Sequence, residues 1–311
     1  MDFLWIVLSL GLGLFLGWKR ILPGFVNNWI GPIINIALIL LLFAMGAQMG
    51  GDREILTQLD RIGLHAFCLA VGSILGSLLM VKLFWKEDTN LPEMAEGNKT
   101  QQESPKGGGF LLLLIILALG LGGLSGFFIP GLWFNYLDQA VIYALALLLL
   151  GIGLDLGRDP RLIKNIFRAG GKNLLLPLWI ALGSIVGAVL TGFLIGLAGF
   201  EAAAVGAGFG WYSLSAVIIS GVYNVELGTL AFLTNISREV LAILTLPLVA
   251  KILGQGATIA PGGATSMDVT LPLIKKVAGN RYVLPAFISG ATLSLMVPLL
   301  VSLFIWLAGF F

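Results

Sequence analysis

Long hydrophobic runs, separated by short polar stretches, fill most of this chain. A helix needs about 20 mostly apolar residues to cross a bilayer. Six runs before residue 200 come close to or exceed that length: 3–18, 29–49, 62–85, 109–128, 136–156 and 173–199. The pattern predicts an all-α polytopic membrane protein.

Composition supports that class, because 58% of the residues are hydrophobic and only 11% are charged. A soluble domain has about 25% charged residues. No basic patch interleaved with aromatic residues is present, which argues against a nucleic-acid partner and leaves membrane lipid as the surroundings. The lone Cys68 and lone His65 argue against an internal disulfide, a metal site or a bound cofactor.

The first half of the chain repeats itself. Three short blocks of one part recur in the same order in the other: 10–14 with 117–121, 45–46 with 152–153, and 71–76 with 182–187. We therefore expect two three-helix units, 1–85 and 109–199, joined by a polar cytoplasmic linker, 86–108. Because a unit with three crossings is inserted upside down in its second copy, the repeat is an inverted one.

The second half contains two glycine-rich polar segments of similar sequence, Gly210–Ser215 and Gly263–Asp268. Each is followed by a long apolar helix with a late proline, Pro247 or Pro298. We expect two hairpin-plus-helix units, 200–253 and 254–311. Irregular backbone survives at membrane depth only where protein or a wet cavity supplies its hydrogen bonds. Broken segments in matching halves are therefore a pointer to a transporter binding site.

Positive charge predicts the orientation, because cytoplasmic loops are rich in Lys and Arg. The basic loop 157–172 is expected inside and loop 50–61 outside. If segments 200–223 and 255–277 are re-entrant hairpins, the chain has eight spans and both termini outside. These basic residues then fall inside: Lys251, Lys275, Lys276 and Arg281. If both segments cross fully, there are ten spans with broken helices and Lys251 lies outside. The eight-span alternative satisfies both charge and repeat.

Charges inside the apolar segments are the first candidates for chemistry. Arg238 and Glu239 lie midway along 227–253, where each charge costs about 2.5–3.5 kcal/mol on insertion scales. Neighbouring helical residues point about 100° apart, so the two are poor partners for each other. Either both form ion pairs that hold the helices together, or Glu239 faces a wet cavity and binds a cation or a proton.

The two broken segments supply the other candidates. Asp268 is either a turn residue or a ligand. The hydroxyl, aromatic and glycine candidates are Ser213, Ser215, Thr265, Ser266, Trp211, Tyr212, Gly208, Gly210, Gly262 and Gly263. Asp52 lies at a helix end in the first unit, either as a loop charge or at the mouth of an external pathway.

Gly208–Ser215, Arg238-Glu239 and Gly263–Asp268 with Thr270-Leu271-Pro272 together resemble the signature of the bacterial LysO-type L-lysine exporters. The resemblance is closest over residues 206–273. It implies export of L-lysine and of lysine analogues across the bacterial inner membrane, and eight spans with both termini outside. It also implies a pair of intramembrane acidic residues, which fall on Glu239 and Asp52.

Lysine suits the candidate residues, because an anion-binding helix N-terminus and a carboxylate complement its two ends. We expect a secondary transporter, not an enzyme, in which Glu239 alternates between lysine and a proton. The alternative is a sodium-coupled carrier of a small organic anion with a similar broken-helix core. The sequence leaves sodium coupling and a homo-oligomer open. An intramembrane protease would need catalytic Ser/His or paired Asp signatures, which the sequence lacks.

Overall fold

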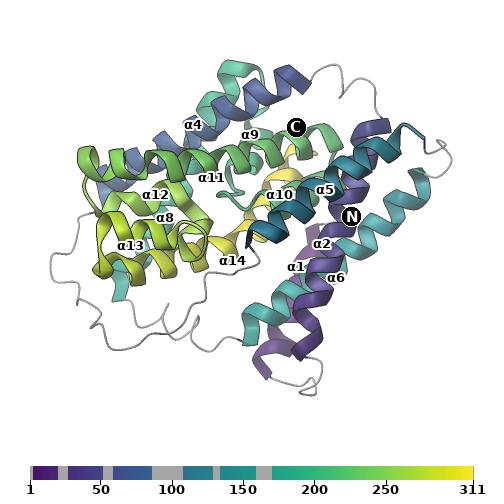
Figure 1. The fold of residues 1–311 in the computed structure, drawn as a ribbon, viewed down its shortest axis with the longest axis horizontal. Coiled ribbons are helices and arrows are strands. Elements are labelled where there is room, and N and C mark those ends of the chain that lie inside the picture. Colours follow the sequence, from purple (N-terminus) through teal and green to yellow (C-terminus); the bar gives the residue numbers. More distant parts are fainter. Residues whose placement is uncertain are drawn as a thin grey trace. The chain divides into compact units, whose positions relative to one another are not determined.

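The computed structural model describes residues 3–19, 27–51, 59–85, 108–128, 134–158 and 170–310. Within these ranges every regular element is helical (Figure 1). The long helices of the first part are α1 (Phe3–Lys19), α2 (Asn27–Gly51), α4 (Leu59–Phe84), α5 (Gly108–Gly126), α6 (Phe134–Arg158) and α8 (Gly170–Ile195). The prediction of an all-helical chain is confirmed for the described residues.

Each of the six predicted runs coincides with one of these helices, and no bound differs by more than four residues. The sequence predicted a single run over 173–199, whereas α8 ends at Ile195. Gly196 then takes a left-handed φ of 78°, and a new helix begins at Gly199. A glycine adopts this conformation at little steric cost, so the apolar run turns without a change in polarity.

Two segments of short helices follow, each interrupted by irregular backbone. The first consists of α9 (Gly199–Gly206) and α10 (Tyr212–Val222), and leads into α11 (Val225–Leu253). The second consists of two 3₁₀ and two α elements: η3 (Gly256–Thr258), α12 (Ile259–Gly262), η4 (Gly263–Met267) and α13 (Leu271–Ala278). It leads through η5 (Asn280–Tyr282) into α14 (Val283–Ala308). The interruptions fall at the two glycine-rich segments that the sequence singled out.

The chain divides into two compact units. Unit 1 comprises Met1–Asp60, Ala95–Pro160 and Ser220–Gly228, and unit 2 comprises Arg61–Met94, Arg161–Ile219 and Thr229–Phe311. Unit 1 thus contains the first two helices of each predicted three-helix repeat. The third helices, α4 and α8, belong to unit 2, together with most of the broken segments.

Unit 1 is a bundle in which glycines bring helix backbones together, α1 against α6 and α2 against α5 (Figure 1). A Cβ on Gly13 would overlap the carbonyl oxygen of Leu150, and a Cβ on Gly50 would overlap that of Gly123. Small residues allow this close approach between membrane helices, where dispersion and weak polar contacts drive association.

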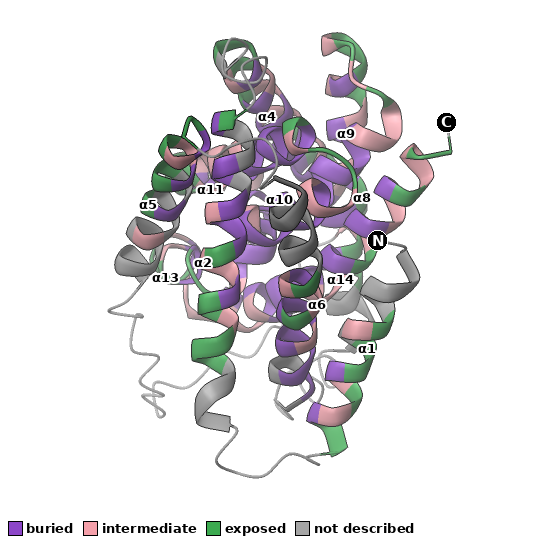
Figure 2. Cartoon of the chain, turned by 90° about the vertical axis from the view of Figure 1, so that its right-hand side faces the viewer, coloured by how far each residue is buried: buried purple, intermediate pink, exposed green. Residues whose placement is uncertain are grey.

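Unit 2 is built around a similar crossing of α4 and α8. Gly72 lies against Gly187, and Gly76 lies against Gly183, each pair so close that a Cβ on either residue would overlap the other's carbonyl oxygen. Buried residues lie where helices face one another, and exposed residues lie on the outer faces (Figure 2). The outer face of α4 carries large apolar side chains such as Leu75, which is 59% exposed.

The first broken segment turns back on itself. α9 runs antiparallel to α8, because Ala202 lies beside Gly192 and Gly206 lies beside Ala188. The start of α10 packs on α11 through an edge-to-face contact between Tyr212 and Phe232. α10 then ends three residues before α11 begins. Together α9 and α10 form a helical hairpin, whose tip is Ala207–Trp211.

The second broken segment also turns back. At its open end the Arg281 guanidinium donates to Gln255 Oε1 at 2.9 Å, and Gly256 lies against Tyr282 and Trp85. At the closed end Gly262 lies against Thr270. η3 and α12 therefore form one limb and α13 the other, and the tip is Gly263–Val269.

Three helices among the described residues are long and apolar enough to cross a membrane: Asp60–Phe84, Leu175–Ile195 and Asn280–Ala308. Their lipid-compatible outer faces and tightly packed glycine seams are the properties of helices in an integral membrane protein.

The α4–α8 crossing can be tested with two alanine substitutions on one helix. Gly76→Ala places a methyl group against the Gly183 carbonyl, and we expect destabilisation by about 1–3 kcal/mol through overpacking. Gly63→Ala is the matched control, because nothing lies within 4 Å of a Cβ there. Thermal unfolding in detergent should show a lower melting temperature for Gly76→Ala alone, and equal melting temperatures would contradict this packing.

Candidate functional site

The tip of the first hairpin is held in an unusual backbone conformation. Phe209 is fully buried, with a left-handed φ of 49°, and Gly210 follows with a φ of 93°. A bulky residue at positive φ is uncommon and costs of order 1–3 kcal/mol unless its surroundings enforce it. The surroundings here include Asn235, whose side chain fills the space that a Cβ on Gly208 would need.

Asn235 on α11 supplies hydrogen bonds that this broken backbone lacks. The Gly210 N–H donates to Asn235 Oδ1 at 2.7 Å, and Asn235 Nδ2 donates to the Val205 carbonyl at 3.2 Å. The same amide nitrogen also lies within hydrogen-bond distance of the Ala231 carbonyl and the Ser215 hydroxyl. One buried amide therefore binds both limbs of the hairpin to α11.

The tip of the second hairpin meets the first. The Ala264 N–H donates to the Phe209 carbonyl at 2.9 Å. Gly263 has a φ of 58°, and a Cβ there would overlap the same carbonyl, so this position needs glycine for both conformation and space. The two tips are therefore in direct contact.

Arg238 lies one turn beyond Asn235 and reaches the second hairpin. Its side chain is 1% exposed. Nε donates to the Pro261 carbonyl at 3.1 Å, and Nη2 donates to the Ala260 carbonyl at 3.2 Å. The guanidinium also donates to two serine hydroxyls, Ser184 on α8 and Ser77 on α4. The structure thus gives Arg238 neutral acceptors, and no ion pair is found for it or for Glu239 among the described residues.

Glu239, Asp268 and Tyr212 lie near one another at the junction. Glu239 is half-buried on α11, and its carboxylate lies close enough to Asp268 for the two charges to repel. Tyr212 is the first residue of α10, and its side chain lies near enough to both Glu239 and Asp268 to feel their charges. Asp268 is solvent-accessible, and its Oδ1 accepts the Val269 N–H at 2.6 Å. Two acidic groups and a phenol thus gather where α10, α11 and the second tip approach.

Most of the predicted hydroxyls are engaged with backbone. Ser215 donates to the Trp211 carbonyl, Thr265 to the Gly262 carbonyl, and Ser266 to the Gly263 and Ala286 carbonyls. Ser213 is also buried, with 5% of its surface exposed. It differs from the others because no hydrogen bond of its hydroxyl is found within the described part of the chain. Gly262 ends α12 just before the second tip and lies beside Thr270, and Trp211, the last residue of the first tip, is half-buried.

Asp52, the other acidic candidate, lies outside the described residues. No group of three or more His, Cys, Asp or Glu residues within the described ranges is placed to hold a metal ion.

Sequence reasoning missed the residues that hold the site together. Asn235, Ser77 and Ser184 were not among the candidates, although a buried amide one turn before Arg238 is a usable signal. The serines carried a weaker signal, because Ser and Thr in membrane helices usually bond to carbonyls of their own helix. Their role toward Arg238 depends on contacts between helices far apart in sequence.

The long apolar helices and the two helical hairpins that meet at their tips define a helical integral membrane protein. The chain matches the lysine exporter LysO family over residues 7–87 and 116–305. It belongs to that family, which is one of transporters and not of enzymes.

Two relatives support this assignment. The chain is 28% identical over 283 residues to the lysine exporter LysO of Escherichia coli strain K12, covering 88% of this chain and 90% of the relative. It is 29% identical over 194 residues to a putative lysine exporter of Haemophilus influenzae, covering 62% of this chain and 96% of the relative. No solved structure matches the fold.

Asn235→Leu tests the support of the first hairpin. The substitution keeps approximate volume but leaves the Gly210 N–H without its partner and removes one of the two donors to the Val205 carbonyl, which still accepts from the Gly208 N–H. A buried unpaired group costs about 1–3 kcal/mol. We expect a clearly lower melting temperature in detergent. Thr245→Val on the same helix is the control, because the Thr245 hydroxyl bonds only to the Leu241 carbonyl of its own turn. Equal effects of the two substitutions would argue against a special role for Asn235.

Proposed function

We propose that this protein exports L-lysine and lysine analogues from the cytoplasm across the bacterial inner membrane, in exchange for protons. The observation that carries the proposal is that Glu239, a half-buried carboxylate with no ion pair among the described residues, lies near Asp268 at the junction of the two hairpins, in a member of the LysO family. The named lysine exporters among its relatives support the choice of substrate.

The ammonium end of lysine binds Glu239 in this proposal. This carboxylate has no basic partner among the described residues, because the Arg238 guanidinium donates to carbonyls and hydroxyls. Burial and a second carboxylate nearby both disfavour the charged form of an acid. A bound cation or a bound proton relieves the repulsion between Glu239 and Asp268. Competition between lysine and a proton for Glu239 couples the two movements.

The carboxylate end of lysine binds the start of α10. The first N–H groups of a helix have no partner within it, and the helix dipole favours an anion there. Ser213 lies in this first turn, and Cα–Cβ bonds of a helix tilt toward its N-terminus. The Cα–Cβ bond of Ser213 is therefore tilted toward the same end of α10 as these N–H groups. Tyr212, adjacent to it, connects this end to the acidic pair.

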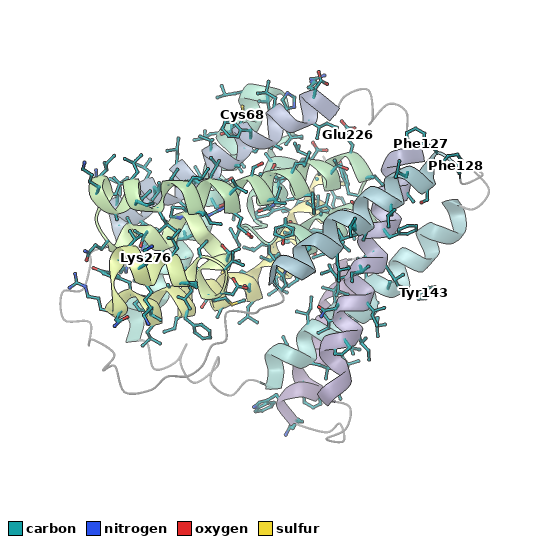
Figure 3. The ribbon with its side chains drawn as sticks, viewed as in Figure 1. Cys68, Phe127, Phe128, Tyr143, Glu226 and Lys276 are labelled. Atoms are coloured by element: carbon teal, nitrogen blue, oxygen red, sulfur yellow. The ribbon has the colours of Figure 1, made fainter. Side chains whose placement is uncertain are left out.

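We further propose eight spans, with both termini outside. Both limbs of the second hairpin open at one end, where Arg281 binds Gln255. Lys251 lies in the last turn of α11, and Lys275 and Lys276 lie in the last turn of α13 (Figure 3 labels Lys276). These cations therefore gather at the open end of the second hairpin. A cytoplasmic location for this end satisfies the positive-inside rule.

Contacts between the third helices support the inverted repeat. The sequence pairs Gly72 with Gly183 and Gly76 with Gly187, whereas in space Gly72 meets Gly187 and Gly76 meets Gly183. A two-fold axis between the helices exchanges these two contacts, as expected for two copies in opposite orientation. Unit 1 follows the same rule, because α1 packs on α6 and α2 packs on α5.

Glu239→Gln tests the mechanism. In proteoliposomes, we expect an outward proton gradient to drive uptake of labelled lysine by the wild-type protein, without sodium, and the substitution to abolish that driven uptake. Glu226→Gln is the matched control, because Glu226 is an exposed acid in the first turn of the same helix (Figure 3). Unimpaired driven uptake by Glu239→Gln would refute the assigned role. Uptake that requires sodium, or no lysine movement by the folded wild type, would favour the organic-anion carrier.

Ser213→Ala tests the carboxylate end. A hydrogen bond to a charged group contributes about 1.5–3 kcal/mol, so the KM for lysine should rise about tenfold or more. Inhibition of lysine counterflow by decarboxylated lysine, which lacks the carboxylate, should not change. A parallel loss for both compounds would place Ser213 outside the carboxylate site.

A further inference from the structure

Arg238 is a buried cation that the proposed transport mechanism does not use. Its side chain is 1% exposed, and it is the largest of the fully buried side chains among the described residues. Burial of an ionised group without a counter-charge costs several kcal/mol unless hydrogen bonds compensate. The local structure therefore has to provide acceptors, and they show what the residue holds in place.

The acceptors come from three different elements. Two are backbone carbonyls of α12, at Ala260 and Pro261, and the other two are the hydroxyls of Ser77 on α4 and Ser184 on α8. The donor is on α11, so one side chain joins four elements. Four of the five N–H groups of the guanidinium are occupied in this way.

The side chain also passes the junction of the two tips. Its Cδ lies 4.0 Å from the position of a Cβ on Gly210, and its Nη2 lies 3.2 Å from that of a Cβ on Gly263. Glycine at Gly263 leaves room for the guanidinium. Lysine would not reproduce the arrangement, because a single ammonium cannot reach acceptors in two directions as a planar fork does.

We propose that Arg238 is a positioning residue: it anchors the α12 limb of the second hairpin to α4, α8 and α11, and does not contact the transported solute. Through this anchor it sets where the second tip, with Asp268, stands relative to Glu239. Asn235 has the corresponding role for the first hairpin, through Val205 and Gly210. Each hairpin thus has its own anchor on one helix.

Thiol labelling tests the anchor without reference to transport. The chain has one cysteine, Cys68, so Cys68→Ser gives a cysteine-free background. A reporter cysteine is placed at Ala257 in the second hairpin or at Ala202 in the first, which are 6% and 0% exposed. Reaction with N-ethylmaleimide in detergent then reports local opening of each hairpin.

Arg238→Gln should accelerate labelling at residue 257 about tenfold, the factor that corresponds to about 1.4 kcal/mol, and leave residue 202 unchanged. Asn235→Leu should instead accelerate labelling at residue 202 and leave residue 257 unchanged. Arg238→Lys should fall between the wild type and Arg238→Gln. Equal acceleration at both reporter positions, or none at residue 257, would overturn the proposal.

A transport measurement separates positioning from direct contact, and this arm rests on the proposed function. If Arg238 only positions the hairpin, Arg238→Gln should lower the maximal rate of lysine counterflow. The ratio of inhibition by lysine to inhibition by decarboxylated lysine should stay as in the wild type. A selective loss of affinity for lysine would mean that the guanidinium binds the solute's carboxylate. Failure of the wild type to move lysine would refute the proposed function and leave the labelling result standing.

Discussion

The broken backbone of the two hairpins must find hydrogen-bond partners within the protein, and the rest of the site follows from that constraint. Away from water, every unpaired N–H or carbonyl group costs free energy. Asn235 satisfies the tip of the first hairpin, Arg238 the limb of the second, and the Ala264 N–H bonds the two tips together. A single face of α11 therefore fixes both hairpins, and the acidic pair is located by them.

Adjacent residues of α11 have opposite environments as a consequence. Arg238 points among helices and is enclosed, whereas Glu239, about 100° around the helix, is half-buried beside Asp268. The cation is used where fixed geometry is needed, because a guanidinium saturated by acceptors has little freedom to move. The acid has no such partners among the described residues, and it is the group to which our proposal assigns the exchange of a proton for a cation. In the proposed mechanism, one turn of α11 thus carries a residue that positions the hairpin, Arg238, and a residue that binds a cation or a proton, Glu239.

The sequence predicts the helices and the two breaks well, because apolar length and glycine clusters act locally. The six early runs coincide with the six long helices α1, α2, α4, α5, α6 and α8. Both tips fall at the glycine-rich segments. The sequence did not reveal that Ser215, Thr265 and Ser266 bond to backbone, or that Ser77 and Ser184 serve Arg238. Those roles depend on which helices face one another, which local patterns do not encode. The expected role of Asp52 remains a prediction.

The two long helices α11 and α14 can be aligned on their late prolines, Pro247 and Pro298. The alignment shows which positions of the proposed repeat make different contacts in the two helices. Asn235 and Ala286 occupy equivalent positions, and each contacts its own hairpin, Asn235 through its amide and Ala286 through a carbonyl that accepts from Ser266. Arg238-Glu239 corresponds to Ser289-Gly290, where Gly290 lets the second tip approach the backbone of α14 directly. α14 therefore contacts the second hairpin by close packing, whereas α11 reaches both hairpins through long polar side chains, Asn235 to the first and Arg238 to the second.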